Sequence, residues 1–343
     1  MAKVAINGFG RIGRAFLKLA VTRPELTVVA VNDLGDLENL AYLLRFDSAY
    51  GRFNKPVETR EHDGNKYLVV DGREILFIQQ KDATQLPWGN LGVDIVVEST
   101  GVFESFEKAR VHQQAGAKRV VLTAPAKDED SGDAKTILMG VNHDELKTST
   151  MSSNGSCTTN SASPVMQVLV EKLGVKKAFL NTIHGYTATQ SLIDGPVKGH
   201  DYRRGRSAAV NITPSTTGAA IAVARVIGQL KGKFDGVAMR VPVLSGSLSA
   251  ITLLAERTTS AEEVNKILEE AANDGRWKGI LSVTRDQLVS TDIMGDPHPA
   301  VVDLSLTKVV DGDLVAVYSW YDNEFGYTNA LVEHVVKAAE TVQ

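Results

Sequence analysis

Residues 3–13 read KVAINGFGRIG, and this stretch decides the fold class of the chain. Residues 3–7 are a short apolar run typical of a buried strand, and residues 11–21 continue as a helical pattern. A second strand over 26–32 and an amphipathic helix over 37–46 repeat the alternation. Short strands that alternate with helices predict a parallel sheet covered by helices, so we expect an α/β domain here.

Three glycines, Gly8, Gly10 and Gly13, form a GxGxxG string between the first strand and the first helix. On its own, such a string fits a flexible turn as well as it fits a ligand-binding turn. Here the strand and helix are in place, and Asp33 ends the second strand 20 positions after Gly13. Together these features predict a dinucleotide site, in which the glycines allow a tight turn, close approach of the pyrophosphate and close helix packing.

The carboxylate of Asp33 would accept hydrogen bonds from the adenosine ribose and would repel a 2′-phosphate. No arginine stands beside it in the sequence Asn32-Asp33-Leu34-Gly35. The sequence therefore favours NAD over NADP as the cofactor. The alternative interpretation of Asp33 is a cap at the end of a strand.

The length, charge and cysteine content of the chain limit its number of domains, its partners and its compartment. Its 343 residues favour two domains, and its net charge of −4 gives no general attraction to nucleic acid or to an anionic membrane. One cysteine allows neither an intrachain disulfide nor a Cys-rich zinc framework, which suits a reducing compartment. We find no secretory signal and no apolar run near the ~18–20 residues that span a bilayer. We therefore expect a cytoplasmic protein without a membrane partner or a bound metal.

The first domain contains an excursion from the α/β pattern. Two strand-like stretches, 66–70 and 74–79, are joined through the hairpin signal Asp71-Gly72, before buried strand patterns resume at 93–98 and 119–123.

After about residue 156 the pattern changes to long strand-like segments with two or three strong helices, which predicts a mixed or antiparallel sheet. These segments cover 178–183, 236–243, 247–255, 301–307 and 314–320. A last helix at about 329–341 has an apolar face that we expect to pack on the first domain. We predict a Rossmann-type dinucleotide-binding domain over 1–156, completed by 322–343, and an α+β catalytic domain over 157–321.

The single cysteine, Cys157, lies in the octapeptide SNGSCTTN at 153–160, before a helical pattern that runs to about residue 173. A lone cysteine is usually a small core residue. This one follows Ser and Asn capping residues and falls in the first turn of a helix, where the dipole and free N–H groups favour a thiolate. We expect its pKa to lie below the free value of about 8.5, and the same N–H groups could hold an oxyanion.

A catalytic cysteine needs a base, and His184 is the best candidate because it ends a predicted strand directly before Gly185-Tyr186-Thr187. The alternative is a strand-end histidine with satisfied hydrogen bonds. We expect His62 and His112 at solvated surface positions.

Three further features indicate anion binding or an interface. The long loop over 186–210 is expected to be functional or an interface, and not a simple connection. Residues 215–220 start a helix whose N–H groups could hold an anion, although a capping box explains them equally well. Arg240 is a charge in an otherwise apolar strand and needs a partner if it is buried, which a phosphate would supply.

Four stretches resemble those of the phosphorylating glyceraldehyde-3-phosphate dehydrogenase family: 8–13, 153–160, HGYTATQ at 184–190 and SWYDNEFGY at 319–327. The similarity covers essentially the whole chain. It implies that Cys157 is the nucleophile and that His184 activates it and serves as base for hydride transfer.

The resemblance also assigns cofactor and phosphate contacts. Asn323 would contact the nicotinamide carboxamide and Tyr327 would shape that end of the site. Further cofactor contacts are expected at Arg11, Ile12, Asp33, Lys81 and Thr123, with Lys81 equally well a plain surface charge. Thr187, Thr189 and Arg240 match a site for the substrate phosphate, and Ser156, Thr158, Thr217 and Gly218 match one for inorganic phosphate.

The implied reaction is oxidation of D-glyceraldehyde 3-phosphate by NAD and inorganic phosphate, in a homotetramer in which the loop near 186–210 lies against a neighbour. Alternatives are erythrose-4-phosphate dehydrogenase and a dinucleotide-binding protein without catalysis. Gly155 stands where the family usually has alanine, a change that could loosen the turn before Cys157. The segment Val197-Lys198-Gly199-His200 has no interpretation.

Overall fold

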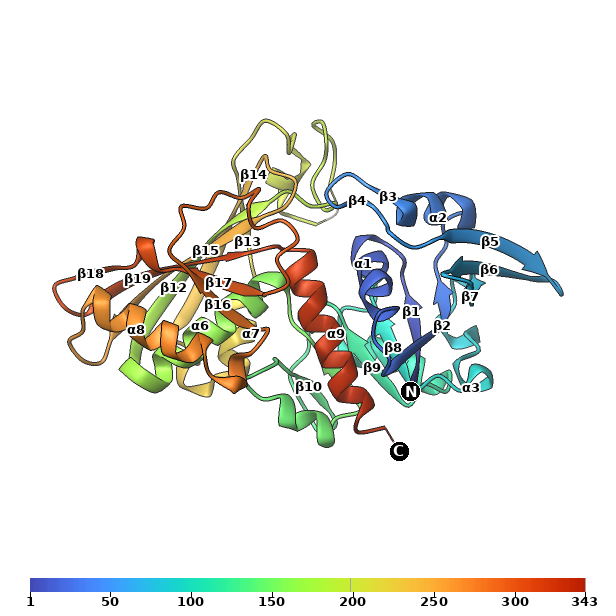
Figure 1. Ribbon diagram of the computed structural model, residues 1–343, viewed down its shortest axis with the longest axis horizontal. Helices are drawn as coiled ribbons and strands as arrows, with labels where there is room; N and C mark the ends of the chain where they lie inside the picture. Colours follow the sequence, from blue (N-terminus) through green and yellow to red (C-terminus); the bar gives the residue numbers. More distant parts are fainter. Residues whose placement is uncertain (198, 343) are drawn as a thin grey trace. The chain divides into compact units, whose positions relative to one another are not determined.

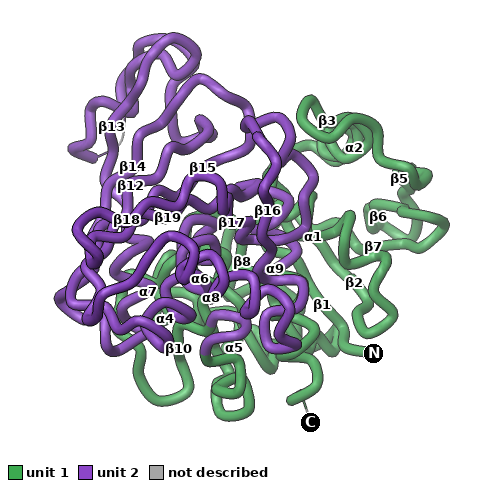
Figure 2. Tube along the Cα trace, turned by 60° about the vertical axis from the view of Figure 1, so that its left-hand side comes forward, with its two compact units in different colours: residues 1–137, 142–155, 331–343 green, residues 138–141, 156–330 purple. Residues whose placement is uncertain are grey.

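The computed structural model describes residues 1–197 and 199–342, which divide into two compact units (Figure 2). Unit 1 comprises residues 1–137, 142–155 and 331–343, and unit 2 comprises residues 138–141 and 156–330. The predicted α/β class with two sheet-based parts is confirmed.

Unit 1 is built on one nine-stranded sheet with the order β10-β11-β9-β8-β1-β2-β7-β6-β5 (Figure 1). All neighbours from β10 to β7 pair in parallel, whereas β7, β6 and β5 pair antiparallel. The strands of unit 1 are β1 (Ala2–Asn7), β2 (Leu26–Asn32), β3 (Phe46–Asp47), β4 (Gly51–Arg52), β5 (Val57–His62), β6 (Asn65–Val70), β7 (Arg73–Ile78), β8 (Ile95–Glu98), β9 (Arg119–Leu122), β10 (Ala134–Thr136) and β11 (Met151–Ser153). The helices are α1 (Arg11–Ala20), α2 (Leu37–Arg45), α3 (Trp88–Leu91), α4 (Phe106–Ala109) and α5 (Val111–Gln114).

Local sequence explains several of these boundaries. Asp36 caps α2 by accepting the backbone N–H of Asn39 at 2.9 Å. Asp71 and Gly72 both have positive φ, 52° and 77°, which is the geometry of a tight hairpin between β6 and β7. The predicted hairpin is therefore confirmed.

Unit 2 has an eight-stranded mixed sheet with the order β13-β14-β12-β15-β19-β17-β16, and β18 pairs with β19. β12 and β14 are parallel, as are β16 and β17, while the other neighbours are antiparallel. The strands are β12 (Val175–Gly185), β13 (Thr213–Thr216), β14 (Phe234–Val241), β15 (Ser247–Ala255), β16 (Leu281–Thr284), β17 (Ala300–Asp303), β18 (Lys308–Val310) and β19 (Leu314–Tyr321). The helices are α6 (Cys157–Leu173), α7 (Ala219–Val226) and α8 (Ala261–Ala272).

The core of unit 2 lies between this sheet and the helices α6, α7 and α8, which Figure 1 shows together on one side of the strands. Val165, Leu169 and Val223 of the helices and Leu180 and Ile251 of the strands are fully or almost fully buried there. Such a core holds β12 and the start of α6 in fixed positions, and these two elements carry the predicted catalytic pair.

The last helix, α9 (Phe325–Ala339), divides between the two units at residue 331. Its residues Leu331, Val332, Val335 and Val336 are buried and group with unit 1, as expected for the apolar face. Residues 322–330, which we expected in the first domain, group instead with unit 2. The reason is local, because the Asp322 carboxylate accepts hydrogen bonds from Ser245 and from the backbone of Gly295.

Two other expectations differ from the structure. The strand predicted over 301–307 ends at Asp303, whose carboxylate accepts the N–H of Ser305 and so starts a short 3-10 turn. His112, expected at the surface, is completely buried in α5. Its imidazole contacts polar side chains from other parts of unit 1, which the sequence around it does not show.

Candidate active site

The glycine turn of unit 1 has three positions with different steric demands. Gly8 has φ of +96°, and a Cβ there would lie 2.6 Å from the backbone nitrogen of Thr100. A Cβ on Gly13 would lie 2.1 Å from the carbonyl oxygen of Gly8. A Cβ on Gly10 would meet nothing within 4 Å. The protein itself therefore requires Gly8 and Gly13, whereas Gly10 leaves open space at the helix start, where a ligand could approach.

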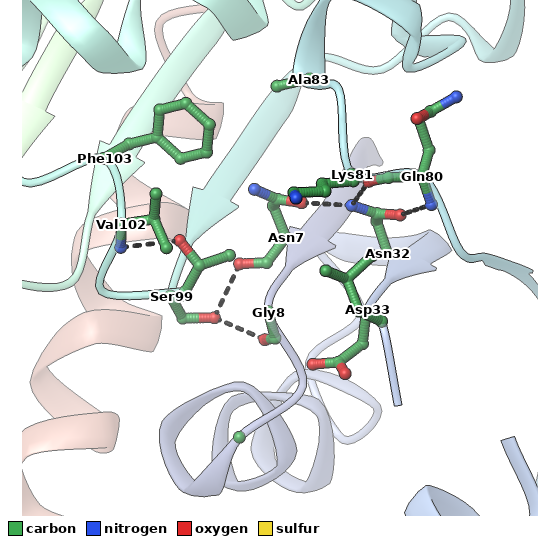
Figure 3. A pocket seen from close by; sticks show the side chains of 13 residues that line it. Asn7, Gly8, Asn32, Asp33, Gln80, Lys81, Ala83, Ser99, Val102 and Phe103 are labelled. Carbon is green, nitrogen blue, oxygen red and sulfur yellow. Dashed lines mark hydrogen bonds between the residues drawn. The ribbon is translucent and has the colours of Figure 1, made fainter. Parts of the chain in front are cut away.

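A cavity of about 460 Å³ adjoins this turn at the carboxyl ends of the strands of unit 1 (Figure 3). This is the position at which open α/β sheets bind their ligands. The lining residues are Asn7, Gly8, Gly10, Asn32, Asp33, Leu34, Gln80, Lys81, Ala83, Ser99, Thr100, Val102 and Phe103.

The structure brings four of the predicted cofactor residues to this cavity: Gly8, Gly10, Asp33 and Lys81. The other predicted cofactor residues of unit 1 are not among its lining residues: Arg11, Ile12, Gly13 and Thr123. Arg11 instead forms an ion pair with Asp47 at 3.2 Å, and Gly13 packs against Gly8. Sequence reasoning missed Asn7, Asn32, Ser99 and Thr100, although each lies at or just after the end of a strand.

Asp33 is held in a fixed orientation at the cavity. Its Oδ2 accepts the N–H of Phe9 at 2.6 Å and its Oδ1 accepts the N–H of Gly35 at 2.8 Å. The carboxylate thus connects the glycine turn to the end of β2, and its remaining lone pairs are available to a ribose. The only basic residue among those that line the cavity is Lys81.

The predicted nucleophile and base lie together in unit 2. Cys157 is the first residue of α6, and its Sγ is 3.3 Å from Nε2 of His184 near the end of β12. Ser156 is the N-cap, and it forms a capping box with Thr159 that sets the start of the helix at Cys157. The turn before it contains Gly155 at φ +65°, a conformation that suits glycine.

The electrostatics of the pair correct one expectation. Burial raises the pKa of the Cys157 thiol, although the Arg240 cation opposes this shift. Burial, helped by the Arg240 charge, lowers the pKa of His184 to about 3. The backbone N–H groups of Cys157 and Thr158 at the helix start do lower the thiol pKa, but the loss of hydration on burial has the larger effect. The pair favours a neutral thiol beside a neutral imidazole at a contact of 3.3 Å.

The other ring nitrogen of His184 determines which tautomer faces the sulfur. Nδ1 lies 2.6 Å from the carbonyl oxygen of Gly185 and 2.7 Å from Nη1 of Arg240. The carbonyl only accepts and the guanidinium only donates, so Nδ1 satisfies one of them at a time. When Nδ1–H donates to Gly185, the Nε2 lone pair faces Cys157 and can take its proton.

Sequence reasoning missed Tyr321, which lies beneath this pair. Its hydroxyl hydrogen-bonds with Oγ1 of Thr158 at 2.9 Å and with Oγ1 of Thr182 at 2.7 Å. Its ring meets the His184 ring edge-on at a centroid distance of 6.0 Å. Because burial raises the pKa of Tyr321, the phenol stays protonated and connects α6 to β12 next to the reacting groups.

The residues predicted for the substrate phosphate lie on the loop after β12 and on β14. Thr187 and Thr189 have their hydroxyl oxygens 3.0 Å apart, and Arg204, which the sequence analysis did not single out, donates to Thr189 at 3.2 Å. Arg240 is register partner of His184 in the adjacent strand and is mostly buried. Two guanidinium groups and two hydroxyls in this part of unit 2 fit an anion.

The residues predicted for inorganic phosphate lie at two helix starts. Ser156 and Thr158 lie at the start of α6, and Thr217 and Gly218 precede α7, which packs against α6. Thr217 accepts the N–H of Ala219 at 3.2 Å, and no side chain caps α7 through Gly218. The capping box considered for 215–220 is therefore not formed.

Asn323 and Tyr327 are buried in unit 2. The hydroxyl of Ser247 donates to Oδ1 of Asn323 at 2.8 Å and accepts the N–H of Gly185 at 3.1 Å. This bond uses the oxygen of the Asn323 amide and directs its NH₂ group elsewhere as a donor. Ser247 was missed by sequence reasoning, and it ties Asn323 to the residue that follows His184.

Within the described ranges, no cluster of His, Cys, Asp or Glu has the makeup of a metal site. Likewise, none of the helices seen over residues 1–197 and 199–342 has the length and apolar character to cross a membrane. Lys198, in the loop segment without an interpretation, lies outside the described residues.

A dinucleotide cavity in one unit and a cysteine–histidine pair in the other define a dinucleotide-dependent oxidoreductase that works through a thiol. Residues 2–106 match the family model "Glyceraldehyde 3-phosphate dehydrogenase, NAD binding domain", and residues 156–323 match the model of the C-terminal domain of the same enzyme. The chain belongs to the glyceraldehyde-3-phosphate dehydrogenase family. The predicted family, fold and NAD cofactor are confirmed.

Three similar proteins show how far the likeness extends, and each is named glyceraldehyde-3-phosphate dehydrogenase. The protein of Clostridium pasteurianum is 46% identical over 99% of this chain and 100% of its own length. That of Thermotoga maritima is 49% identical over 97% of this chain and 98% of its own. That of Geobacillus stearothermophilus is 47% identical over 96% of each.

Proposed function

We propose that this chain oxidises D-glyceraldehyde 3-phosphate to 1,3-bisphosphoglycerate with NAD and inorganic phosphate, as an enzyme of glycolysis and gluconeogenesis. The observation that carries the proposal is the contact of 3.3 Å between Sγ of Cys157 and Nε2 of His184 at the start of α6. Membership of the family supplies the substrate class.

The reaction begins with the thiol. His184 Nε2 takes the Cys157 proton, and the thiolate adds to the aldehyde carbon, which gives a thiohemiacetal. The backbone N–H groups in the first turn of α6 stabilise the oxygen that becomes negative. His184 then returns its proton to this oxygen, so that the thiohemiacetal carries a hydroxyl group. When bound, NAD would supply the acceptor for the hydride that leaves the carbon. His184 would take the hydroxyl proton in the same step, which leaves a thioester on Cys157.

Inorganic phosphate then attacks the thioester carbon, and the Cys157 thiolate leaves. We place the substrate phosphate at Thr187, Thr189 and Arg240, with Arg204 added from the structure. We place inorganic phosphate at Ser156, Thr158, Thr217 and Gly218. Their support is that Arg240 is the register partner of His184 and that Thr187 and Thr189 follow β12. Ser156 and Thr158 flank Cys157 at the start of α6, and Thr217 and Gly218 precede α7, which packs against α6.

The cofactor contacts are also part of the proposal. We assign Gly8, Gly10, Gly13, Arg11, Ile12, Asp33, Lys81 and Thr123 of unit 1, and Asn323 and Tyr327 of unit 2. The residues around the cavity fit NAD, because Gly10 leaves room for the pyrophosphate and the Asp33 carboxylate would bind a ribose but repel a 2′-phosphate. The NH₂ group of Asn323 would donate to the nicotinamide carboxamide.

We further infer a homotetramer in the cytoplasm. Large apolar side chains are exposed along the loop that follows β12: Leu192 and Ile193 are 76% and 77% exposed, and Val210 and Ile212 are 75% and 71% exposed. Such a cluster is typical of a contact with another chain. Light scattering on the purified protein tests this, and a stable active monomer would contradict it.

The experiment that tests the activity measures NADH formation from D-glyceraldehyde 3-phosphate with and without inorganic phosphate. Turnover that requires phosphate supports the proposal, while sustained turnover without phosphate would contradict the proposed site for inorganic phosphate. Parallel assays with NADP and with erythrose 4-phosphate test the cofactor preference and the alternative substrate. No turnover with any pair would favour a binding protein without catalysis.

A further inference from the structure

A row of polar side chains crosses the sheet of unit 1 at the floor of the cofactor cavity. Asn7, Asn32 and Glu98 are the last residues of β1, β2 and β8, and Asn7 is register partner of both others. Asn32 Nδ2 donates to Asn7 Oδ1 at 2.7 Å, and Asn7 Nδ2 donates to Glu98 Oε2 at 2.6 Å. Figure 3 shows the Asn32–Asn7 bond at the cavity. The row therefore connects lining residues to Glu98, which does not line the cavity.

Beyond Glu98 the network continues into two fully buried aromatic residues, His112 and Trp88. Trp88 Nε1 lies 3.1 Å from His112 Nδ1, and an indole N–H can only donate. Nδ1 must therefore accept, which leaves the hydrogen of the neutral imidazole on Nε2. That nitrogen is 2.9 Å from Glu98 Oε2 and donates to it. Trp88 thus selects the tautomer in which His112 supports the carboxylate.

The Glu98 side chain is buried and every contact it makes is with a donor. Oε2 accepts from Asn7 and His112, and Oε1 accepts from the backbone N–H of Thr100 at 2.8 Å and from the Thr100 hydroxyl. Four donors around one carboxyl group fit its ionised form. All four donors are neutral groups, so the charge is held by oriented dipoles and not by a cation.

Glu98 also fixes the 99–100 turn, which packs on Gly8, the first glycine of the GxGxxG string. The Thr100 nitrogen that Glu98 holds is the atom that lies 2.6 Å from where a Cβ on Gly8 would be. On the same turn, Ser99 Oγ donates to the carbonyl oxygen of Gly8 at 2.7 Å. A loss of the Glu98 contacts would release this turn, and with it the side chain of Asn7 on the cavity floor.

We propose that Glu98 and His112 are positioning residues for NAD, because they fix the Asn7 side chain and the 99–100 turn against the glycine turn. This inference rests on the proposed cofactor site. Both residues act through the cavity wall and lie in unit 1, whereas Cys157 and His184 lie in unit 2. Their removal should therefore weaken NAD binding and leave turnover at saturating NAD nearly unchanged.

The test measures the Kd for NAD by calorimetry, the KM for NAD, kcat and Tm in the full-length protein. Glu98→Gln replaces an acceptor by a donor, and His112→Leu removes the donor to Glu98. His112→Gln retains an amide N–H that can reach Glu98. The matched control is His334→Gln, because His334 is also fully buried in unit 1 but bonds Ser152 at 2.7 Å, away from the cavity lining.

We expect Glu98→Gln and His112→Leu to raise the Kd and KM for NAD at least tenfold with kcat within threefold, and His112→Gln to stay within threefold in Kd. The control substitution His334→Gln should lower Tm without a change in the Kd for NAD. If Glu98→Gln does not fold, the comparison of the two His112 variants decides. Kd values within twofold of the unaltered protein, or an equal rise in the control, would overturn the inference. Failure of the unaltered protein to bind NAD would instead refute the proposed cofactor site.

Discussion

Substitution of Gly13 and of Gly10 by alanine should separate the folding role of the glycine turn from its binding role. In Gly13→Ala the new Cβ would lie 2.1 Å from the Gly8 carbonyl oxygen and 3.1 Å from Ser99 Oγ, so the helix or the turn must move. Overpacking of this kind costs about 1–3 kcal/mol of stability. A clash with a backbone atom should cost close to the upper value, because backbone cannot move aside as a side chain can. For a unit of roughly 150–250 residues, about 3 kcal/mol corresponds to a fall in Tm of about 6–12 °C.

Gly10→Ala is the matched case, because its Cβ would meet no protein atom within 4 Å. Gly10 is the N-cap of α1 with extended backbone, so alanine should cost at most about 1 kcal/mol of stability there. The methyl group would occupy the space in which the pyrophosphate approaches the helix start, so the Kd for NAD should rise at least tenfold, which is about 1.4 kcal/mol.

Differential scanning calorimetry and NAD titration on both variants check the two effects separately. The reasoning predicts a large fall in Tm with Gly13→Ala and a small one with Gly10→Ala, but weak NAD binding in Gly10→Ala. A Gly13→Ala protein as stable as the unaltered one would refute the packing argument. Normal NAD affinity in Gly10→Ala would refute the placement of the pyrophosphate.

Three further predictions follow from the site and from a buried histidine. Cys157→Ala should abolish NADH formation and His184→Asn should lower kcat by about 10²–10⁴-fold, and near-normal rates in steady-state assays would contradict the mechanism. Arg204→Ala should raise the KM for the phosphorylated aldehyde with the KM for NAD unchanged, whereas an unchanged aldehyde KM would remove Arg204 from the anion site. Burial lowers the pKa of His334 from 6.5 to about 4. Between about pH 6.5 and pH 4 the unfolded chain binds a proton at this residue and the folded chain does not, so the free energy of unfolding should fall by up to about 3 kcal/mol as the pH falls through this range. Urea unfolding of His334→Gln should show a smaller loss over that range, and an equal loss would place the acid sensitivity elsewhere.

Much of the candidate site could be predicted because its signals are local. The spacing of Gly8, Gly10 and Gly13 and the acidic residue at Asp33 depend on one strand–turn–helix unit, and the structure brings three of these four residues to the cavity. Cys157 at the first position of α6 depends on the capping pattern that precedes it. Local hydrogen bonds and periodicity specify such features within a few residues, so they are visible in the sequence.

Other parts depend on contacts between residues far apart in the chain. His112 has a polar, helical sequence context typical of a surface, yet Trp88 and Glu98 bury it and choose its tautomer. The same holds for Arg204 beside Thr189 and for Tyr321 beneath Cys157, neither of which carries a local signal for its partner.

By itself the sequence determined the α/β class, the position of the glycine turn and the place of Cys157 at the start of a helix. Only the tertiary structure decided the electrostatic state of that thiol. The helix start favours a thiolate at Cys157, but the burial created by packing of α6 and β12 raises the thiol pKa and lowers that of His184. Residues from many parts of the chain together exclude water from a buried group. The effect of this lost hydration on a pKa therefore cannot be predicted from the residues next to that group in the sequence.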